Sequence, residues 1–405
     1  MLDDFGQRIR DIILSEMDLS RELSDEEICD LIGSVVSREA RDRPMTIKDR
    51  AEIERTIFNS LRKLDVLQEL VDDRDVTEIM VNGPNDIFYE KAGRIQRFKG
   101  HFSSEEKLED VIQQIVGRHN RVVNQASPIV DTRLSDGSRV NIVLNPISIG
   151  GSAVSIRKFP EHPMSMERLV EIEALSPEVA RLLQILMQAK YNIFISGGTG
   201  SGKTTFLNAL SQYIPDDERI ITIEDSAELQ LLGAKNIVRL ETRNANTDGV
   251  TPITIRDLIR TALRMRPDRI IVGECRGAEA LDMLQAMNTG HDGSLSTGHA
   301  NSPHDIISRI ETMVLQGQDF PLNAIRQQIA SGIDIIVQLG RLRDKSRRVL
   351  EISEVDGFMD GEIVLHTLYR FEETAVLDSG RIQGFLKKAG TLCHTDKLMA
   401  AGLSV

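Results

Sequence analysis

The chain has 405 residues, a net charge of −13, and hydrophobic and charged fractions of 40% and 27%. These fractions are near the averages of globular proteins and the length allows two or three domains, so the composition argues against wholesale disorder. The sequence holds no run of about 18 apolar residues, the length needed to cross a membrane. Its acidic start also lacks the basic end and apolar stretch of a secretory signal, and we expect a cytosolic protein.

Two further classes of site are disfavoured by the residue counts. Cys29, Cys275 and Cys393 lie far apart with no CxxC pair, which argues against a disulfide framework and against structural zinc. Residues 1–75 include 12 basic and 20 acidic residues, so this part of the chain has no electrostatic footprint for nucleic acid.

Residues 1–73 are predicted to be helical. Ser24 with Glu27, and Thr46 with Asp49, have the spacing of capping boxes, and apolar residues follow each pair at helical spacing. The apolar faces of these helices either pack into a small bundle or arm, or dock a partner.

Residues 74–160 are predicted to form an α+β domain. Short runs rich in β-branched residues at 76–84, 86–98 and 132–144 are punctuated by Asn-Gly, Ala-Gly and Asp-Gly turn signals, and one helix is expected at 103–120. Three arginines lie on or beside these strands, and each taken alone is most often a surface charge: Arg133, Arg139 and Arg157.

In residues 161–405, apolar strands alternate with helices. We expect strands at 191–196, 219–225, 236–241, 269–274 and 293–299, and helices at 203–214, 254–265, 277–288 and 302–314. This alternation predicts an α/β domain whose parallel sheet is covered on both faces. Ligands of such sheets bind at the carboxyl ends of the strands.

The stretch GGTGSGKT matches G-x-x-x-x-G-K-[ST] between a predicted strand and a predicted helix. Glycines let the backbone wrap a phosphate with its N–H groups inward, and the helix start adds a positive dipole. Lys203 would reach the β- and γ-phosphates, and the Thr204 hydroxyl would bind Mg²⁺. The predicted nucleotide-binding residues are Gly197, Gly198, Thr199, Gly200, Ser201, Gly202, Lys203, Thr204 and Thr205.

A phosphate-binding loop alone does not make a hydrolase, which also needs a carboxylate near the metal and a group that positions water. One predicted strand ends in Glu224 and Asp225, and another ends in Glu274 after Gly273, where more usual P-loop ATPases have an aspartate. Each acid alone is as often the N-cap of the following helix. Two such strand ends beside the phosphate loop favour catalysis.

The stretch GHDGSLSTGHAN places His291 and His299 eight residues apart. His299 follows a short predicted strand, so it is expected at the same edge of the sheet as Lys203, where an imidazole would contact the γ-phosphate. A structural histidine and a metal ligand shared with His291 are the alternatives.

Four motifs in this order resemble the traffic, or secretion, ATPases of type II and type IV secretion and of type IV pili. They are GGTGSGKTT, TIEDSAEL, RIIVGECRGAEALDML and NTGHDGSLSTGHAN, and the resemblance extends over about residues 75–370. Within that superfamily, VRLETR and TIRDLIRTALRMRPDRIIVGE look most like the CpaF-type ATPases of Flp/Tad pilus systems. The resemblance implies a RecA-like core preceded by a smaller, PAS-like α+β domain.

The resemblance also implies a role for each motif residue. Glu224 would polarise the attacking water, Glu274 would lie near Mg²⁺, directly or through water, and His299 would contact the γ-phosphate. Arg239 and Arg243 would compensate phosphate charge in their own or a neighbouring subunit. The α+β domain would cap the nucleotide with one or more of its three arginines.

The family further implies ATP and Mg²⁺ as cofactors and a homohexamer in the cytoplasm, docked to polytopic inner-membrane platform proteins. Its work would be the assembly, or also the retraction, of a pilus. Gly298 departs from the β-branched residue usual before His299, and we expect it to loosen the strand end and soften the sensor. The rival functions are a catalytically weak ATP-binding scaffold and a nucleic-acid translocase, the latter disfavoured by the acidic charge.

Overall fold

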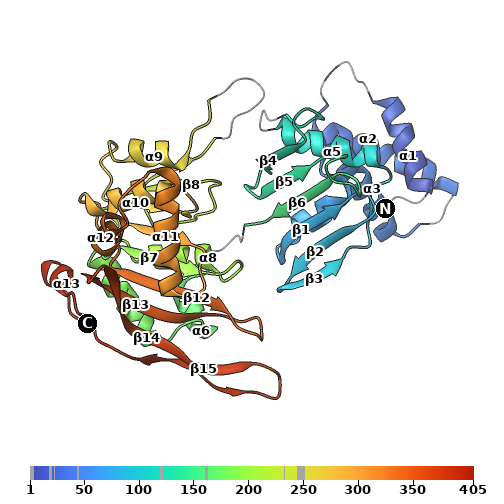
Figure 1. Cartoon of the computed structure of the whole chain (residues 1–405). Coiled ribbons are helices and arrows are strands. Elements are labelled where there is room, and N and C mark those ends of the chain that lie inside the picture. The colour runs from blue at the N-terminus through green and yellow to red at the C-terminus, as the bar shows by residue number, and fades with distance from the viewer. Residues whose placement is uncertain are drawn as a thin grey trace. The chain divides into compact units, whose positions relative to one another are not determined.

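The computed structural model describes residues 4–17, 21, 23–42, 45–118, 122–159, 163–231, 233–243 and 251–405. The chain divides into two compact units, Met1–Glu161 and His162–Val405, coloured in Figure 1 from blue to red along the chain. Two predicted boundaries lie outside the described residues, namely the helix end at 119–120 and the domain end at Pro160. The division into three domains stays a prediction.

The first unit opens with three helices: α1 (Asp4–Glu16), α2 (Asp25–Glu39) and α3 (Ile47–Arg62). The predicted capping boxes of α2 and α3 are confirmed. The Ser24 hydroxyl accepts from Glu27 N while the Glu27 carboxylate accepts from Ser24 N, and Thr46 and Asp49 do the same. These bonds satisfy N–H groups that a helix start leaves without partners. The helices share a cluster of buried side chains: Ile9, Ile13, Ile28, Ile32, Val35, Val36 and Ile57.

The rest of the first unit is built on one antiparallel sheet. Its described strands are β1 (Val76–Asn82), β2 (Ile87–Lys91), β3 (Arg94–Arg97), β4 (Ile129–Arg133), β5 (Arg139–Val143) and β6 (Ala153–Arg157). They lie in the order β3-β2-β1-β6-β5-β4. The helices α4 (Gln68–Asp72) and α5 (Glu105–Gly117) accompany them. The apolar side of α5 supplies Leu108, Val111, Ile112, Ile115 and Val116 to a core shared with the sheet.

The second unit alternates helices and strands as the sequence predicts. Its described strands are β7 (Ile193–Gly197), β8 (Arg219–Glu224), β9 (Asn236–Glu241), β10 (Arg269–Val272), β11 (Leu295–Gly298), β12 (Ile335–Arg341), β13 (Arg347–Met359), β14 (Glu362–Val376) and β15 (Ile382–Lys388). Its described helices are α6 (Met166–Glu171), α7 (Pro177–Gln188), α8 (Lys203–Ser211), α9 (Ile255–Ala262), α10 (Glu279–Asn288), α11 (Pro303–Gly317), α12 (Leu322–Gly332) and α13 (Asp396–Ala400).

These strands form one sheet in the order β15-β14-β13-β12-β7-β11-β10-β8-β9. From β9 to β12 neighbouring strands are parallel, and from β12 to β15 they are antiparallel. The predicted α/β class and parallel-rich sheet are therefore confirmed. The antiparallel strands continue the sheet in long ribbons, drawn from orange to red in Figure 1.

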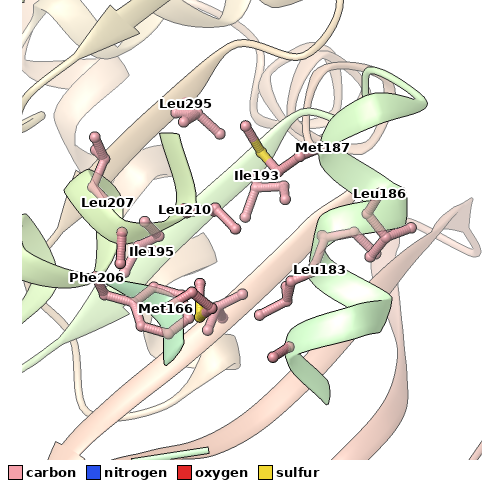
Figure 2. Close-up of a cluster of buried hydrophobic side chains, with 14 of the residues drawn as sticks. Met166, Leu183, Leu186, Met187, Ile193, Ile195, Phe206, Leu207, Leu210 and Leu295 are labelled. Carbon is pink, nitrogen blue, oxygen red and sulfur yellow. The ribbon is translucent and has the colours of Figure 1, made fainter. Parts of the chain in front are cut away.

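Strand β7 shows why a continuous apolar run makes a central strand. Ile193 and Ile195 face one core, which includes α7 and α8, and Phe194 faces the other, which includes α9 to α12. Figure 2 shows Leu207 and Leu210 of α8 beside Ile193 and Ile195, with Leu183, Leu186 and Met187 of α7 close by. Each fully buried side chain of this kind contributes about 1.5–3 kcal/mol. The helix that follows the glycine loop is thus held firmly on the sheet.

A final feature of the described helices concerns membranes: none of them combines the length and the apolarity that crossing a bilayer requires.

Candidate nucleotide-binding site

The glycine loop joins the end of β7 to the first residue of α8, and its backbone needs glycine. Gly200 and Gly202 have φ angles of +70° and +94°, which side chains rarely adopt. A Cβ on Gly197 would lie 2.5 Å from the Ser201 hydroxyl oxygen and 2.7 Å from the Leu339 carbonyl oxygen. The loop is therefore tightly wound against its own turn and against β12, with a helix N-terminus directly behind it.

Lys203 is held inside this loop. Its Nζ lies 3.1 Å from the carbonyl oxygen of Gly197, 3.2 Å from that of Gly198 and 3.2 Å from His299 Nδ1. The residue is 8% exposed. An ammonium group desolvated in this way is a strong attractant for an anion that enters the loop.

His299 connects Lys203 to Glu274. It follows β11, and its Nε2 lies 2.7 Å from Glu274 Oε1. Burial and the nearby Lys203 charge lower the pKa of His299, although Glu274 opposes them. Since an ammonium can only donate to Nδ1, the neutral ring has its proton on Nε2, the nitrogen that lies close to Glu274. The site therefore contains a neutral imidazole between a cation and an anion.

Glu274 follows β10 and is bound on its other side by Arg276. The distance from Glu274 Oε2 to Arg276 Nη2 is 2.5 Å, and this hydrogen bond raises the pKa of Arg276. Arg276 Nη1 also lies 3.9 Å from Asp225 Oδ2 at the end of β8. Arg276 is not among the site residues predicted from the sequence, although it stands two residues after the predicted acid.

Glu224, the last residue of β8, is only 3% exposed. Its Oε2 accepts hydrogen bonds from the backbone N–H groups of Glu228 (2.7 Å) and Leu229 (2.9 Å). Its Oε1 has no hydrogen-bond partner among the described residues. Burial raises the pKa of Glu224 to about 7, against the lowering effect of the two backbone donors. One carboxylate oxygen is therefore fixed and the other is free to take a proton.

Gly273 makes the position of Glu224 possible. A Cβ built on Gly273 would lie 2.8 Å from Glu224 Cγ, closer than real contacts allow. The backbone N–H of Gly273 donates to the Ile223 carbonyl oxygen (2.8 Å), so the two strand ends are fixed side by side. The glycine that replaces the usual aspartate thus gives its side-chain space to the acid of the neighbouring strand.

Two histidines that are close in sequence are separated by the fold. His291 precedes β11 and its Nδ1 lies 3.2 Å from the Ala286 carbonyl oxygen near the end of α10, whereas His299 follows β11. The described residues include no group of three or more His, Cys, Asp or Glu side chains placed to hold a metal ion. Magnesium at nucleotide sites usually takes only one or two protein ligands together with phosphates and water. The Thr204 hydroxyl in the first turn of α8 and the Glu274 carboxylate are oxygen ligands of that kind.

Gly298 does not leave the strand end loosely packed. It is buried in β11 opposite Ser196, and a Cβ on it would lie 2.9 Å from Phe194 Cε1 and 3.0 Å from Ile306 Cδ1. The expectation of a loosened strand end is wrong because these two side chains fill the space that a β-branched residue would take.

The two arginines near β9 differ in their surroundings. Arg239 is exposed on β9 opposite Thr222, and its charge is among the influences that lower the pKa of Glu224. Arg243 forms an isolated bridge with Ile253, and its guanidinium donates to the Thr251 carbonyl oxygen (3.2 Å). Arg239 is thereby placed within electrostatic range of a predicted site residue, Glu224.

The three arginines of the first unit form a row across neighbouring strands. Arg133 is paired with Arg139, and Arg139 is paired with Arg157. Residues directly opposite in antiparallel strands have side chains on the same face. Asp131 lies 3.7 Å from Arg139, and Glu78 lies 3.9 Å from Arg157. Their contact with a nucleotide stays a prediction.

A further arginine, which the sequence does not predict as a site residue, contacts the glycine loop. Arg347 Nε donates to the Gly200 carbonyl oxygen at 2.9 Å. The only signal in the sequence is the basic run RLRDKSRR at 341–348, which lies more than 130 residues from the loop. No spacing rule connects segments that are so far apart.

Comparisons with known proteins concern the family and the fold of the chain. The family described as "Type II/IV secretion system protein" matches residues 60–383. Rv3659c of Mycobacterium tuberculosis (strain H37Rv), provisionally named a conjugal transfer protein, is 33% identical over 322 residues, which are 77% of this chain and 91% of that protein. The type IV secretion system protein PtlH of Bordetella pertussis (strain Tohama I) is 33% identical over 320 residues, 73% of this chain and 94% of PtlH.

Among solved structures, the pilus retraction motor PilT with bound ADP is similar in fold. Its TM-score is 0.52 with 21% sequence identity, and the match covers 82% of this chain and 84% of that one. At this identity the likeness concerns the fold, that is, the arrangement of helices and strands.

Proposed function

We propose, because the chain belongs to the type II/IV secretion system protein family, that it is an ATP-hydrolysing motor. The observation that carries this proposal is the continuous polar chain from Lys203 through His299 to Glu274, with the buried Glu224 on the next strand of the sheet. A binding module needs the loop and its lysine, but it has no use for two acids and an imidazole set at the same edge.

Each side chain has a distinct role in this proposal. Lys203 exchanges its carbonyl and imidazole partners for the β- and γ-phosphates when nucleotide enters. His299, released from Lys203, would change tautomer, so that Nδ1–H donates to the γ-phosphate and Nε2 becomes an acceptor. Thr204 and Glu274 would hold Mg²⁺, Glu274 directly or through water, and the ion would neutralise phosphate charge.

Glu224 is the general base of the proposed reaction. A base works best when its pKa is close to the operating pH, because it is then both ionised and willing to take a proton. Burial raises the pKa of Glu224 to about 7. Its Oε1, which has no partner among the described residues, would accept the proton from the attacking water.

The arginines complete the proposed site around the phosphates. Arg239 and Arg243 would compensate phosphate charge, in the same subunit or in a neighbouring one. The row of Arg133, Arg139 and Arg157 would cap the nucleotide from the α+β domain. The alignment of these three guanidinium groups on one face of the sheet gathers positive charge there, which supports an anionic ligand for them in addition to Asp131 and Glu78.

For the machine in which the motor works, we propose a Flp/Tad-type pilus system or a related secretion system. The motifs VRLETR and TIRDLIRTALRMRPDRIIVGE support the pilus assignment. A protein named for type IV secretion and one named for pilus retraction are among the similar proteins. The chain would act as a homohexamer with a RecA-like core and a PAS-like α+β domain. It would lie in the cytoplasm and dock on polytopic inner-membrane platform proteins.

The test is phosphate release from Mg²⁺-ATP together with molar mass from light scattering, for wild type, Lys203→Ala and Glu224→Gln. We expect the wild type to turn over as a hexamer and both variants to be inactive. A wild type that binds ATP without turnover, alone and with platform proteins in membranes, would support the rival scaffold function. Stimulation of turnover by DNA with strongly salt-dependent binding would instead support the translocase.

A further inference from the structure

The hairpin that joins β12 and β13 overhangs the glycine loop. Strands β7 and β12 pair in parallel up to Gly197 and Leu339. Beyond that point β7 turns into the loop, while β12 continues to Arg341 and returns as β13 from Arg347. The end of the hairpin therefore extends past the last pair of β7 and β12 and lies beside the loop.

Arg347 spans the gap between the hairpin and the loop. Its Nε donates to the Gly200 carbonyl oxygen at 2.9 Å, and its Cδ would lie 3.5 Å from a Cβ on Gly202. The guanidinium has four further N–H donors on its two Nη atoms. Among the described residues, no acceptor is recorded for these donors, and the side chain is exposed.

Arg341 stands directly opposite Arg347 on the paired strand, so the two side chains share one face of the hairpin. Like charges in directly opposite positions destabilise a strand pair. The neighbouring Arg343 and Arg348 are paired with Glu373 and Glu173, whereas the described residues offer no acid to Arg341 or Arg347. Residues 341–348 have five basic side chains and one acid in a chain whose net charge is −13. This concentration of positive charge beside the glycine loop favours the binding of an anion there.

We propose that Arg347 binds the polyphosphate of the nucleotide from the hairpin side, with Arg341 adding a second positive charge. The Nε–H bond to the Gly200 carbonyl oxygen holds the arginine at the loop. Its Nη groups would then donate hydrogen bonds to phosphate oxygens. A planar guanidinium suits this task because it binds a backbone oxygen and an anion at the same time. The inference rests on the proposed function, since it assigns a further ligand to the same nucleotide.

The experiment measures the binding of a slowly hydrolysed ATP analogue, ATPγS, to the full-length chain at four salt concentrations. The variants are Arg347→Ala, Arg347→Lys and Arg341→Ala, and Arg343→Ala is the matched control. Arg343 lies on the same hairpin and loses the same charge, but it is bound to Glu373. The melting temperature without nucleotide is measured for every variant, so that damage to the fold is recognised.

We expect Arg347→Ala to raise the Kd by about 10-fold and to make the Kd less dependent on salt, since one charge contact with the ligand is lost. Arg347→Lys retains part of the affinity, Arg341→Ala has a smaller effect of the same sign, and Arg343→Ala stays within about twofold of the wild type. In turnover, Arg347→Ala raises the KM for ATP more than it lowers kcat.

Two results would overturn the inference. The first is an Arg347→Ala variant that binds ATPγS as tightly as the wild type. The second is weaker binding with an unchanged salt dependence, which would mean that Arg347 only shapes the loop through Gly200. In both cases the wild type still binds nucleotide and Lys203→Ala does not, so the proposed function stands. If the wild type itself fails to bind, the proposed function fails first.

Discussion

The side chain of Glu224 occupies the space in which a side chain at Gly273 would have to lie. A Cβ on Gly273 would approach Glu224 Cγ to 2.8 Å, and the backbone bond from Gly273 N to the Ile223 carbonyl oxygen leaves neither strand free to retreat. The two residues belong to different motifs, 49 positions apart. The glycine and the acid therefore form one structural unit at the edge of the sheet.

Gly273→Ala tests this unit. The added methyl group would displace the Glu224 carboxylate, and a shift of about 1 Å at a reacting group costs about 10²-fold in rate. We expect kcat to fall by about that factor while the KM for ATP changes little, since the glycine loop is untouched. Steady-state phosphate release measures both constants.

The control for this prediction is Gly33→Ala, which adds the same methyl group in α2 where nothing lies within 4 Å. It is expected to leave kcat unchanged. A Gly273→Ala variant with the kcat of the wild type would show that Glu224 has room to move without loss of rate.

The activity of the wild type is expected to rise with pH through about 7. Only the ionised carboxylate can accept a proton, and burial raises the pKa of Glu224 to about 7. The pKa of His299 is lowered by burial and by Lys203, so the titration of this residue is displaced to the acidic side of the rise. The dependence of kcat on pH between 5.5 and 9 measures the rise.

Glu224→Gln should lower kcat by about 10²–10⁴-fold and abolish this dependence. A residual activity that still rises through pH 7 would assign the titration to another group.

Stability should change with pH in the opposite direction. The folded pKa of Glu224 is about 7 and the ordinary value is 4.5, so between these values the folded state binds more protons than the unfolded state. The free energy of unfolding therefore falls as the pH rises from 4.5 to 7, by up to about 3 kcal/mol for this group. Below pH 4.5 Glu224 is protonated in both states, so its titration no longer changes the free energy of unfolding.

Urea unfolding of the wild type and Glu224→Gln at pH 5 and pH 8 measures this contribution. The variant should gain stability relative to the wild type at pH 8 but not at pH 5. Equal differences at the two pH values would contradict a buried, proton-binding Glu224.

His299→Ala removes the connection between Lys203 and Glu274. Both partners lose a neutral group that orients them. The γ-phosphate also loses the proposed His299 donor, and the loss of one donor at a reacting group costs about 10²-fold in kcat. His291→Ala is the matched control, because the His291 ring contacts the Ala286 carbonyl oxygen at the opposite end of β11, away from Lys203. Phosphate release under saturating ATP compares the two, and equal rates would remove His299 from the site.

Leu207→Ala tests the packing of α8, the helix that follows the glycine loop, against the sheet. Leu207 is fully buried between α8 and the sheet, and a truncation of this kind costs about 2–5 kcal/mol. The urea midpoint of unfolding should fall accordingly. Leu315→Ala, at a position that is 46% exposed, should change stability by no more than about 0.5 kcal/mol. A Leu207→Ala variant as stable as this control would contradict the packing in Figure 2.

The parts of the fold that the sequence predicts are those with strong local patterns. The continuous apolar run YNIFIS predicts β7, and in the structure its side chains face two cores. Ser24 and Thr46 predict helix starts because a capping box involves only residues that are close in the sequence. The rule that parallel strands end at one edge was enough to expect Lys203, Glu274 and His299 together. The close polar contacts between them lie along that edge.

What the sequence does not predict depends on contacts between distant segments. Arg347 reaches the loop only because β12 pairs with β7, and that pairing joins segments more than 130 residues apart. The fit of Glu224 over Gly273 depends on tenths of an ångström. The antiparallel strands β12 to β15 carry mixed polar and apolar residues, so their alternation alone does not reveal that they extend the parallel sheet.

The antiparallel strands that extend the sheet connect the nucleotide site to a long ribbon. Strand β12 lies directly beside β7, and hydrogen bonds tie it to β13 and then to β14. Strand β14 has 15 residues, a length of at most about 50 Å when fully extended. A tilt of β12 by a few degrees, imposed when Arg347 or Gly200 shifts, would therefore sweep the far end of the ribbon through several ångströms. Hydrogen bonds therefore connect the phosphate loop, through β12 and β13, to the far end of this ribbon.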